Sequence, residues 1–264
     1  MKLKSCLFLL CLSLSPLLFL PRAHADEASD KAVFDSCLPK AEAGDAYCQF
    51  VIGASYELGR GGVPQDYAQA VVWYRKAAEQ GNTRAQLNLG HKYLNGHGVK
   101  QDYAQAVVWY RKAAEEGDAM AQYFLGDLYY FGQGIPQDYA QAEIWFRKSA
   151  EQGDSDAQYN LGDMYLNGQG VPQDYAKAVG WYLKAAEQGD AKAQFNLGAL
   201  YANGQGVPQN WFNAYILYSL AAVSGHSNSV KYRDIIAAKL SPPDLAEAQK
   251  RANSWKVGTK LPLR

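Results

Sequence analysis

The sequence has 264 residues, of which 48% are hydrophobic, and its 26 Lys and Arg residues balance its 26 Asp and Glu residues. This balance argues against a nucleic-acid-binding protein, because such proteins present a basic patch or stripe to the phosphate backbone. After the first 25 residues, no apolar segment approaches the roughly 20 residues that span a bilayer. We therefore expect no transmembrane segment in the mature chain.

Residues 1–25 predict a cleavable signal peptide. They combine a basic start at Lys2 and Lys4, an apolar run over residues 7–20 and a small-x-small cleavage motif at residues 23–25. The apolar run has about 14 residues, which is too short to cross a bilayer. Cleavage removes three basic residues and no acidic one, which leaves 23 against 26 and a formal net charge of −3. We therefore expect a soluble periplasmic or secreted protein.

Two cysteines, Cys37 and Cys48, remain after this cleavage. In an oxidising compartment an isolated even pair of cysteines is most simply a disulfide. We expect this bond to staple the first helix pair, which has no neighbour on one side. A pair of buried free thiols is the alternative.

Internal repetition at a period of 36 residues dominates the rest of the chain. Such self-similarity marks stacked supersecondary units that cannot bury their apolar faces alone. We therefore expect an all-α protein, an α/α solenoid (superhelix) of about five to six helix–turn–helix repeats plus a C-terminal capping helix. The expected segments are the signal peptide (1–25), an N-terminal degenerate repeat (26–65), four full repeats (66–101, 102–137, 138–173 and 174–209), a divergent repeat (210–240), and the capping helix with a tail (241–264).

One full copy, residues 66–101, predicts two helices joined by a turn. Asp66 can accept hydrogen bonds from the free amides of the first turn, and Gly81 stands where a left-handed residue ends the first helix. Apolar residues at positions 70, 73, 74, 77 and 78 share one helical face. The second helix should run from about Thr83 to Asn95.

Two further columns of residues recur in all four copies. Gly90 and its counterparts sit in mid-helix, where Gly costs about 1 kcal/mol relative to Ala, so we expect close backbone contact with a partner helix. Trp73 and its counterparts fall on the apolar stripe, so we interpret them as core residues rather than as a stacking platform. The two columns are Gly90, Gly126, Gly162 and Gly198, and Trp73, Trp109, Trp145 and Trp181.

Beyond the fifth copy, residues 241–244 form a strong helix start. Ser241 can cap the helix, Pro242 suits its first position, and Asp244 places an acid in the first turn. We expect this last helix to reach about Trp255 and to cover the open end of the stack.

The repeat resembles the Sel1-like repeat family, a relative of the tetratricopeptide repeats. The motif A-x-x-W-Y-x-K-A-A-E-Q-G, followed after four residues by A-Q-x-x-L-G-x-x-Y-x-x-G-x-G-V, begins at Ala70 and returns in three further copies. The resemblance covers roughly residues 40–225 and implies a superhelix that acts as an adaptor or scaffold, often in the bacterial envelope. Its motif positions are structural, so it implies no catalytic residue. A cysteine-rich branch linked to β-lactams carries a cysteine pair in each repeat, and this chain departs from it with its single pair.

The sequence shows no group of residues with the spacing of a catalytic or metal site. No serine of the mature chain has Lys three residues later, as a serine acyl-enzyme of the penicillin-binding kind would. His91 and His97 vary between copies and are interpreted as outward positions, and the ladder that starts at Glu79 as solvated surface or structural pairing. We expect no catalytic residue, no metal site, no cofactor and no enzymatic activity.

Three columns of the first helices point away from the apolar stripe. An aliphatic residue kept between two polar ones suits a groove that holds an extended peptide, and first helices usually line the concave side in this superfamily. The alternative is that these residues only contact the adjacent repeat. The candidate partner-binding residues are Gln69, Val72, Lys76, Gln105, Val108, Lys112, Gln141, Ile144, Lys148, Lys177 and Lys184.

Together these patterns favour a non-catalytic scaffold or adaptor that is periplasmic or secreted and monomeric. It would bind a protein or peptide partner through the concave face. One alternative is an envelope enzyme that acts on cell-wall material or β-lactams through an acid–base pair assembled across repeats. Another is a glycan-binding module that uses exposed tyrosines such as Tyr130.

Overall fold

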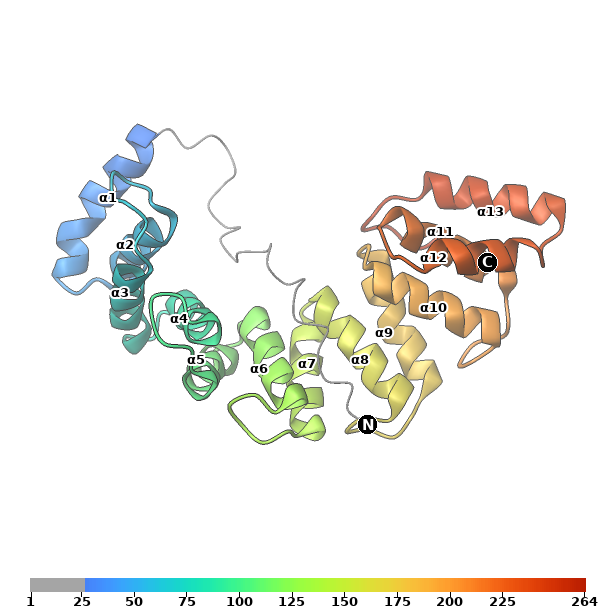
Figure 1. Ribbon diagram of the computed structural model, residues 1–264, viewed down its shortest axis with the longest axis horizontal. Helices are drawn as coiled ribbons and strands as arrows, with labels where there is room; N and C mark the ends of the chain where they lie inside the picture. The colour runs from blue at the N-terminus through green and yellow to red at the C-terminus, as the bar shows by residue number, and fades with distance from the viewer. Residues whose placement is uncertain (1–26) are drawn as a thin grey trace. The chain divides into compact units, whose positions relative to one another are not determined.

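The computed structural model describes residues 27–264, and this part of the chain folds into thirteen α-helices with no strand (Figure 1). The chain divides into two compact units, unit 1 up to Trp109 and unit 2 from Tyr110 onward. The expected signal peptide, residues 1–25, lies outside the described residues. Among the thirteen helices, none has both the length and the apolar composition needed to cross a membrane.

Unit 1 contains the degenerate N-terminal helix pair and the first full copy of the repeat. Its helices are α1 (Glu27–Glu42), α2 (Ala46–Leu58), α3 (Tyr67–Glu79), α4 (Thr83–Asn95) and the first part of α5 (Tyr103–Glu115). The expected second helix of the first copy, from about Thr83 to Asn95, is thereby confirmed as α4.

Unit 2 contains the rest of α5 and eight further helices. They are α6 (Ala119–Phe131), α7 (Tyr139–Glu151), α8 (Ser155–Asn167), α9 (Tyr175–Glu187), α10 (Ala191–Asn203), α11 (Trp211–Val223), α12 (Ser229–Ala237) and α13 (Pro242–Ser254). First and second helices of successive copies alternate through α12. The described chain is thus an all-α repeat solenoid.

The helix boundaries follow from capping side chains. The carboxylate of Asp66 accepts hydrogen bonds from the main-chain N–H groups of Ala68 and Gln69, at 2.9 and 3.0 Å. Asp174 and Asn210 cap α9 and α11 in the same way. Gly81, two residues beyond α3, has φ +87°, a left-handed conformation that suits glycine.

The mid-helix glycines receive aromatic rings from the next copy. In unit 1, a Cβ placed on Gly53 would lie 2.7 Å from Cδ1 of Tyr74, and in unit 2 a Cβ on Gly162 would lie 2.5 Å from Cδ1 of Tyr182. Both rings are fully buried. The expected close contact at this column is therefore confirmed, but it is with a side-chain ring rather than with a backbone. Only glycine leaves room for that ring, which explains its recurrence at a position that disfavours it.

The tryptophan column lies at the edge of the core. Trp109 and Trp145 are buried, and Trp73 and Trp181 are half-buried but still pack against core clusters, as the core interpretation expects. The fully buried ring of each first helix comes from the next residue, as with Tyr74. Trp73 and Trp181 therefore reach the surface along one edge, where a side chain from outside the core can contact them.

The last helix begins where the sequence predicts, with Ser241 accepting a hydrogen bond from the N–H of Asp244 at 3.3 Å. α13 packs against α11 (Figure 1). On α12, Val230, Tyr232 and Ile235 remain 41–48% exposed. The expected cover of the open end is therefore only partial, because α13 lies on the first helix of the fifth copy.

Candidate partner-binding face

The candidate residues occupy three aligned positions on the first helices, spaced i, i+3 and i+7, which places them on one side of each helix. We call them the outer columns. Column one holds Gln69, Gln105, Gln141 and Lys177; column two holds Val72, Val108, Ile144 and Gly180; column three holds Lys76, Lys112, Lys148 and Lys184. Gln69, Val72, Lys76, Gln105 and Val108 belong to unit 1, and the others belong to unit 2.

Column two exposes aliphatic side chains. Val72, Val108 and Ile144 are 46%, 44% and 42% exposed, whereas the neighbouring inward residues Ala70 and Tyr74 are fully buried. The outward orientation of this column therefore agrees with the sequence pattern. A single exposed aliphatic residue needs no explanation, but the same exposure at a fixed repeat position marks a surface that can lose water on contact with a partner.

The column-three lysines lie over the tryptophan rings. The Nζ atoms of Lys76 and Lys148 are each 4.2 Å from the ring centroids of Trp73 and Trp145, and Lys184 Nζ is 4.0 Å from that of Trp181. This cation–π contact fixes the lysine stem along the helix surface. The ammonium groups stay exposed beside column two, where they can attract a carboxylate.

Column one and column two change character in α9. Lys177 pairs with Asp174 at 3.7 Å and lies over the ring of Tyr165 at 5.1 Å. Gly180 leaves open space, since a Cβ placed on it would meet nothing within 4 Å. The aliphatic column of unit 2 is therefore interrupted at α9.

The fifth copy buries the same three positions. Asn213, Ile216 and Leu220 stand in columns one, two and three of α11, and their exposed fractions are 1%, 0% and 5%. α13 covers α11, and residues 258–264, which we call the tail segment, are bonded to Asn213 at the start of that helix. The repeat pattern does not predict this burial, and the change from Lys to Leu in column three is the one sign of it in the sequence.

The column that contains His91 is directed into the protein. His91, Asp127 and Asp163 are half-buried rather than outward, so that interpretation was wrong. Burial lowers the pKa of His91 to about 4, helped by the charge of Lys92, and burial raises the pKa of Asp127 to about 6. Asp163 accepts hydrogen bonds from the hydroxyl of Tyr182 and, at 3.2 Å, from Asn196. These polar groups serve the packing between copies.

Other sequence candidates are placed as follows. His97 is exposed and stacks on Tyr67, with ring centroids 5.4 Å apart. Tyr130 is half-buried and donates a hydrogen bond to Gln169 at 2.9 Å, so it is not the exposed tyrosine expected for glycan stacking. Within residues 27–264, no group of three or more His, Cys, Asp or Glu side chains could hold a metal ion.

The two cysteines of the first helix pair meet in its core. Cys37 and Cys48 are buried thiols whose sulfur atoms lie 2.7 Å apart. Burial, followed by the neighbouring Cys37, raises the pKa of Cys48 to about 12, so the thiol stays protonated at neutral pH. The side chains can approach each other as a disulfide requires, and the bond itself remains a prediction.

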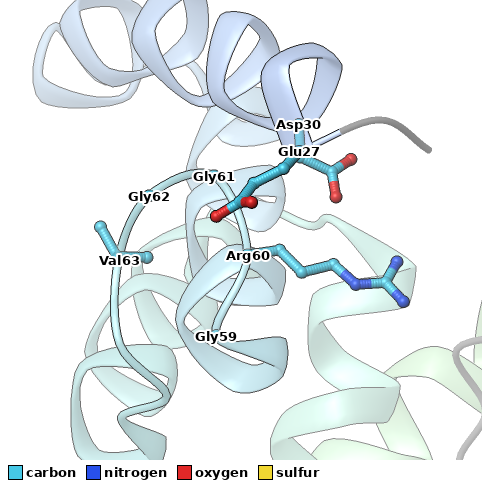
Figure 2. A pocket seen from close by; sticks show the side chains of 7 residues that line it. All are labelled: Glu27, Asp30, Gly59, Arg60, Gly61, Gly62 and Val63. Carbon is cyan, nitrogen blue, oxygen red and sulfur yellow. The ribbon is translucent and has the colours of Figure 1, made fainter.

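The pocket in Figure 2 lies away from the outer columns. It has a volume of about 390 Å³ and is lined by Glu27 and Asp30 of α1 and by the loop of residues 59–63. No candidate partner-binding residue contributes to it. Its open rim and its lining of charged side chains and glycines, with Val63 as the one aliphatic side chain, distinguish it from the enclosed, mostly apolar pockets that small ligands occupy.

Comparison with known proteins places the repeat in a family. The Sel1 repeat model matches residues 46–82, 83–118, 119–154, 155–190 and 191–226. Each matched segment begins at a second helix and ends after the next first helix. The most extensive helix contacts inside each unit follow the same division, since they join α2 to α3, α6 to α7, α8 to α9 and α10 to α11.

Two solved structures are similar over most of the chain. A Sel1 repeat protein from Oxalobacter formigenes is 32% identical with a TM-score of 0.72, over 87% of this chain and 93% of that one. The protective antigen c5321 of uropathogenic Escherichia coli is 35% identical with a TM-score of 0.59, over 83% of this chain and 56% of that one. No curated protein matches the chain. With five matched repeats and a similar solved structure of nearly the same extent, this protein belongs to the Sel1 repeat family.

Proposed function

We propose that this protein is a non-catalytic scaffold or adaptor that binds a protein or peptide partner on the outer columns of its first helices. Sel1 repeat proteins generally mediate protein–protein interactions and are typically non-catalytic scaffolds, which supports the proposal. The proposal adds a particular surface, the outer columns, to that general role.

One observation carries this proposal. The aliphatic residues of column two are 42–46% exposed in α3, α5 and α7, while Ile216 in the same column of α11 is fully buried under other parts of the chain. An aliphatic side chain at this position is therefore tolerated both in water and in a packed contact, as a residue of a binding surface must be. Each exposed column-two residue that a partner covered would add roughly 1 kcal/mol of favourable burial.

The polar columns define the chemistry of the partner. Gln69, Gln105 and Gln141 carry side-chain amides, which can donate to and accept from the main chain of an extended segment. The column-three lysines favour a partner with Asp or Glu beside its apolar residues, because complementary charge directs association. We therefore expect a short aliphatic segment with acidic neighbours.

A periplasmic or secreted location belongs to the same proposal. It rests on the leader-like residues 1–25 and on the close pair Cys37 and Cys48, which suits an oxidising compartment. If the location is right, the protein recovered from the envelope or medium starts at Asp26. Its intact mass is then 2 Da lower than that of the reduced protein, because one disulfide removes two hydrogens. A retained leader or two free thiols in that material would contradict it.

The decisive experiment selects peptides that bind the full protein from a random display library and measures their affinity for two variants. The column variant carries Val72→Ala, Val108→Ala and Ile144→Ala. The matched control carries Val223→Ala, Val230→Ala and Ile235→Ala, which truncates the same residue types at 46–87% exposure on α11 and α12.

We expect the column variant to bind the selected peptides at least about tenfold more weakly, since roughly 1.4 kcal/mol corresponds to a factor of ten. The control should bind as the unmodified protein does, and all three proteins should show the same helical circular dichroism. Equal affinities for the two variants would place the binding surface elsewhere.

A further inference from the structure

The tail segment, residues 258–264, is bound to unit 2 without being part of a helix or strand. Its first N–H, from Gly258, donates to the main-chain oxygen of Glu187 at 2.8 Å, where α9 ends. Its last residue, Arg264, is bonded to Asn213, in the first turn of α11. The segment therefore links the end of one first helix to the start of the next.

Asn213 holds the main chain of the segment from both sides. Its Nδ2 donates to the main-chain oxygen of Arg264 at 2.7 Å, and its Oδ1 accepts from the N–H of the same residue at 2.9 Å. The N–H of Leu261 donates to Glu187 Oε1 at 3.3 Å. Because these bonds use main-chain atoms of the tail, they would hold any short peptide in this position.

Selectivity comes from the side chains of the segment. The guanidinium carbon of Arg264 lies 3.6 Å from the ring centroid of Phe212, and its Nη1 lies 2.9 Å from Asp244. Leu261 and Leu263 pack on the two core clusters centred on α9–α10 and on α11–α13. The surface therefore recognises the pattern Leu-x-Leu-Arg, with both leucines in contact with both clusters and a planar cation at Arg264.

The tail rests on this surface as a docked peptide rather than as a core element. Residues 256 and 257, which lead into the tail segment, are exposed, as are its residues 258–260 and Arg264, and residues 261–263 are only half-buried. With the tail in place, Phe212 and Asn213 beneath it are each 1% exposed, and Glu187 and Asp244 at its edge are half-buried. An exposed segment that covers a few enclosed side chains is the arrangement of a peptide site that carries its own ligand.

We propose that Phe212, Asn213, Asp244 and Glu187 form a peptide-binding site whose resident ligand is the tail segment and which takes a Leu-x-Leu-Arg segment of a partner protein in its place. This site uses α11, α13 and the end of α9, whereas the proposed function rests on exposed residues of α3, α5 and α7. Either can therefore fail without the other.

The test uses the full chain with a weakened tail. The tail variant carries Leu261→Ala, Leu263→Ala and Arg264→Ala, which removes the selective contacts and leaves the receiving surface intact. The probe is a fluorescein-labelled peptide of the sequence Gly-Thr-Lys-Leu-Pro-Leu-Arg, and its binding is measured by fluorescence anisotropy. A peptide with Ala at both leucines and at the arginine is the matched control probe.

We expect the probe to bind the tail variant at least about tenfold more tightly than the unmodified protein, because a tethered tail competes at an effective concentration in the millimolar range. Adding Asn213→Ala to the tail variant should reduce binding at least about tenfold, and the control probe should not bind. Should the triple change unfold the protein, Arg264→Ala alone opens the site partially and keeps the same order of affinities.

A second variant distinguishes specific from non-specific binding of the probe. Asp244→Asn in the tail variant should weaken the probe that contains arginine several-fold and leave a probe with Ala at that position unchanged. The proposal is overturned if the probe binds the tail variant no better than the unmodified protein, or if Asn213→Ala leaves binding intact. A dimer of the unmodified protein that free probe dissociates would identify a second copy as the occupant and overturn the assignment to another protein.

Discussion

α7 and α11 both carry residues of the outer columns, but these residues are accessible to solvent on α7 and buried on α11. Gln141, Ile144 and Lys148 of α7 lie at the surface, whereas the matching residues of α11 are buried beneath the chain that follows them. Column two holds isoleucine in both helices, with 42% of Ile144 and none of Ile216 exposed. The residue type at this position therefore does not decide its burial; what covers the helix does.

The test with the largest expected effect truncates the two column-two isoleucines, Ile216 and Ile144. Ile216→Ala should lower the free energy of unfolding by about 2–5 kcal/mol, because it leaves a cavity in a packed cluster. Ile144→Ala should change it by no more than about 0.5 kcal/mol, as is usual at the surface. Urea denaturation of the two variants measures both values. Similar losses would mean that the face of α7 is covered in solution as well.

A second test compares two glycines of neighbouring helices in unit 2. Gly162→Ala should destabilise by about 1–3 kcal/mol, because the new Cβ meets the ring of Tyr182, which has no free space to move into. Gly180→Ala should stabilise by up to about 1 kcal/mol, since nothing lies within 4 Å and Ala favours the helix. Thermal unfolding followed by circular dichroism reports both signs. A stabilising Gly162→Ala would contradict the ring contact.

The sequence predicted the parts of the fold that repeat. The caps at Asp66 and Ser241, the left-handed Gly81 and the bounds of α4 all follow from local chemistry, which acts over a few residues. Alignment of the copies at one period also predicts which positions point inward. It treats all copies alike, so it could not predict that Trp73 is half-buried whereas Trp145 is buried.

The covered face of α11 could not be predicted in this way. Its cover comes from α13 and from residues 258–264, and the latter have no counterpart in any other copy and no periodic pattern. The hydrogen bonds between Asn213 and Arg264 join residues 51 positions apart. The buried column of Asp127 was missed for a related reason, because variation between copies was taken as a sign of exposure. Only the packed neighbours show that those polar residues are enclosed.

Lowering the pH should stabilise the middle copies more than the contact between the fourth and fifth copies. The position of Asp127 is occupied by Ala199 before the fifth copy, so only the middle copies hold a buried carboxylate there. Burial raises the pKa of Asp127 from 3.8 to about 6, so the folded protein favours the protonated carboxyl. The contribution of Asp127 to the free energy of unfolding is therefore greatest below about pH 4 and is lost as the pH rises through 6.

Asp127→Asn removes this dependence. It should stabilise the protein by about 1–2 kcal/mol at pH 7.5, given about 1.4 kcal/mol for each unit of pKa shift and some residual contact with solvent. The advantage over the unmodified protein should shrink toward zero at pH 4.5. Urea denaturation at the two pH values gives the difference, and an advantage that grows in acid would have the wrong sign.

The smallest effect concerns Gly180 on α9. Among the first helices, α9 comes between α7, whose outer columns lie at the surface, and α11, whose outer columns are buried. Its column is aliphatic at Ile144 and at Ile216, and the gap at α9 is wide enough for a side chain. Gly180→Val should raise stability by less than about 1 kcal/mol, because valine is only somewhat better than glycine in a helix.

Its effect on binding carries more information than its effect on stability. If a partner lies along column two as one continuous segment, Gly180→Val fills the gap and should strengthen binding of peptides selected on the full protein by about two- to fivefold, the gain from a partly buried aliphatic side chain. If the partner touches each first helix independently, the affinity stays unchanged. Isothermal titration of the same peptide against both proteins distinguishes the two, since only a continuous contact adds buried apolar surface and makes the heat-capacity change more negative.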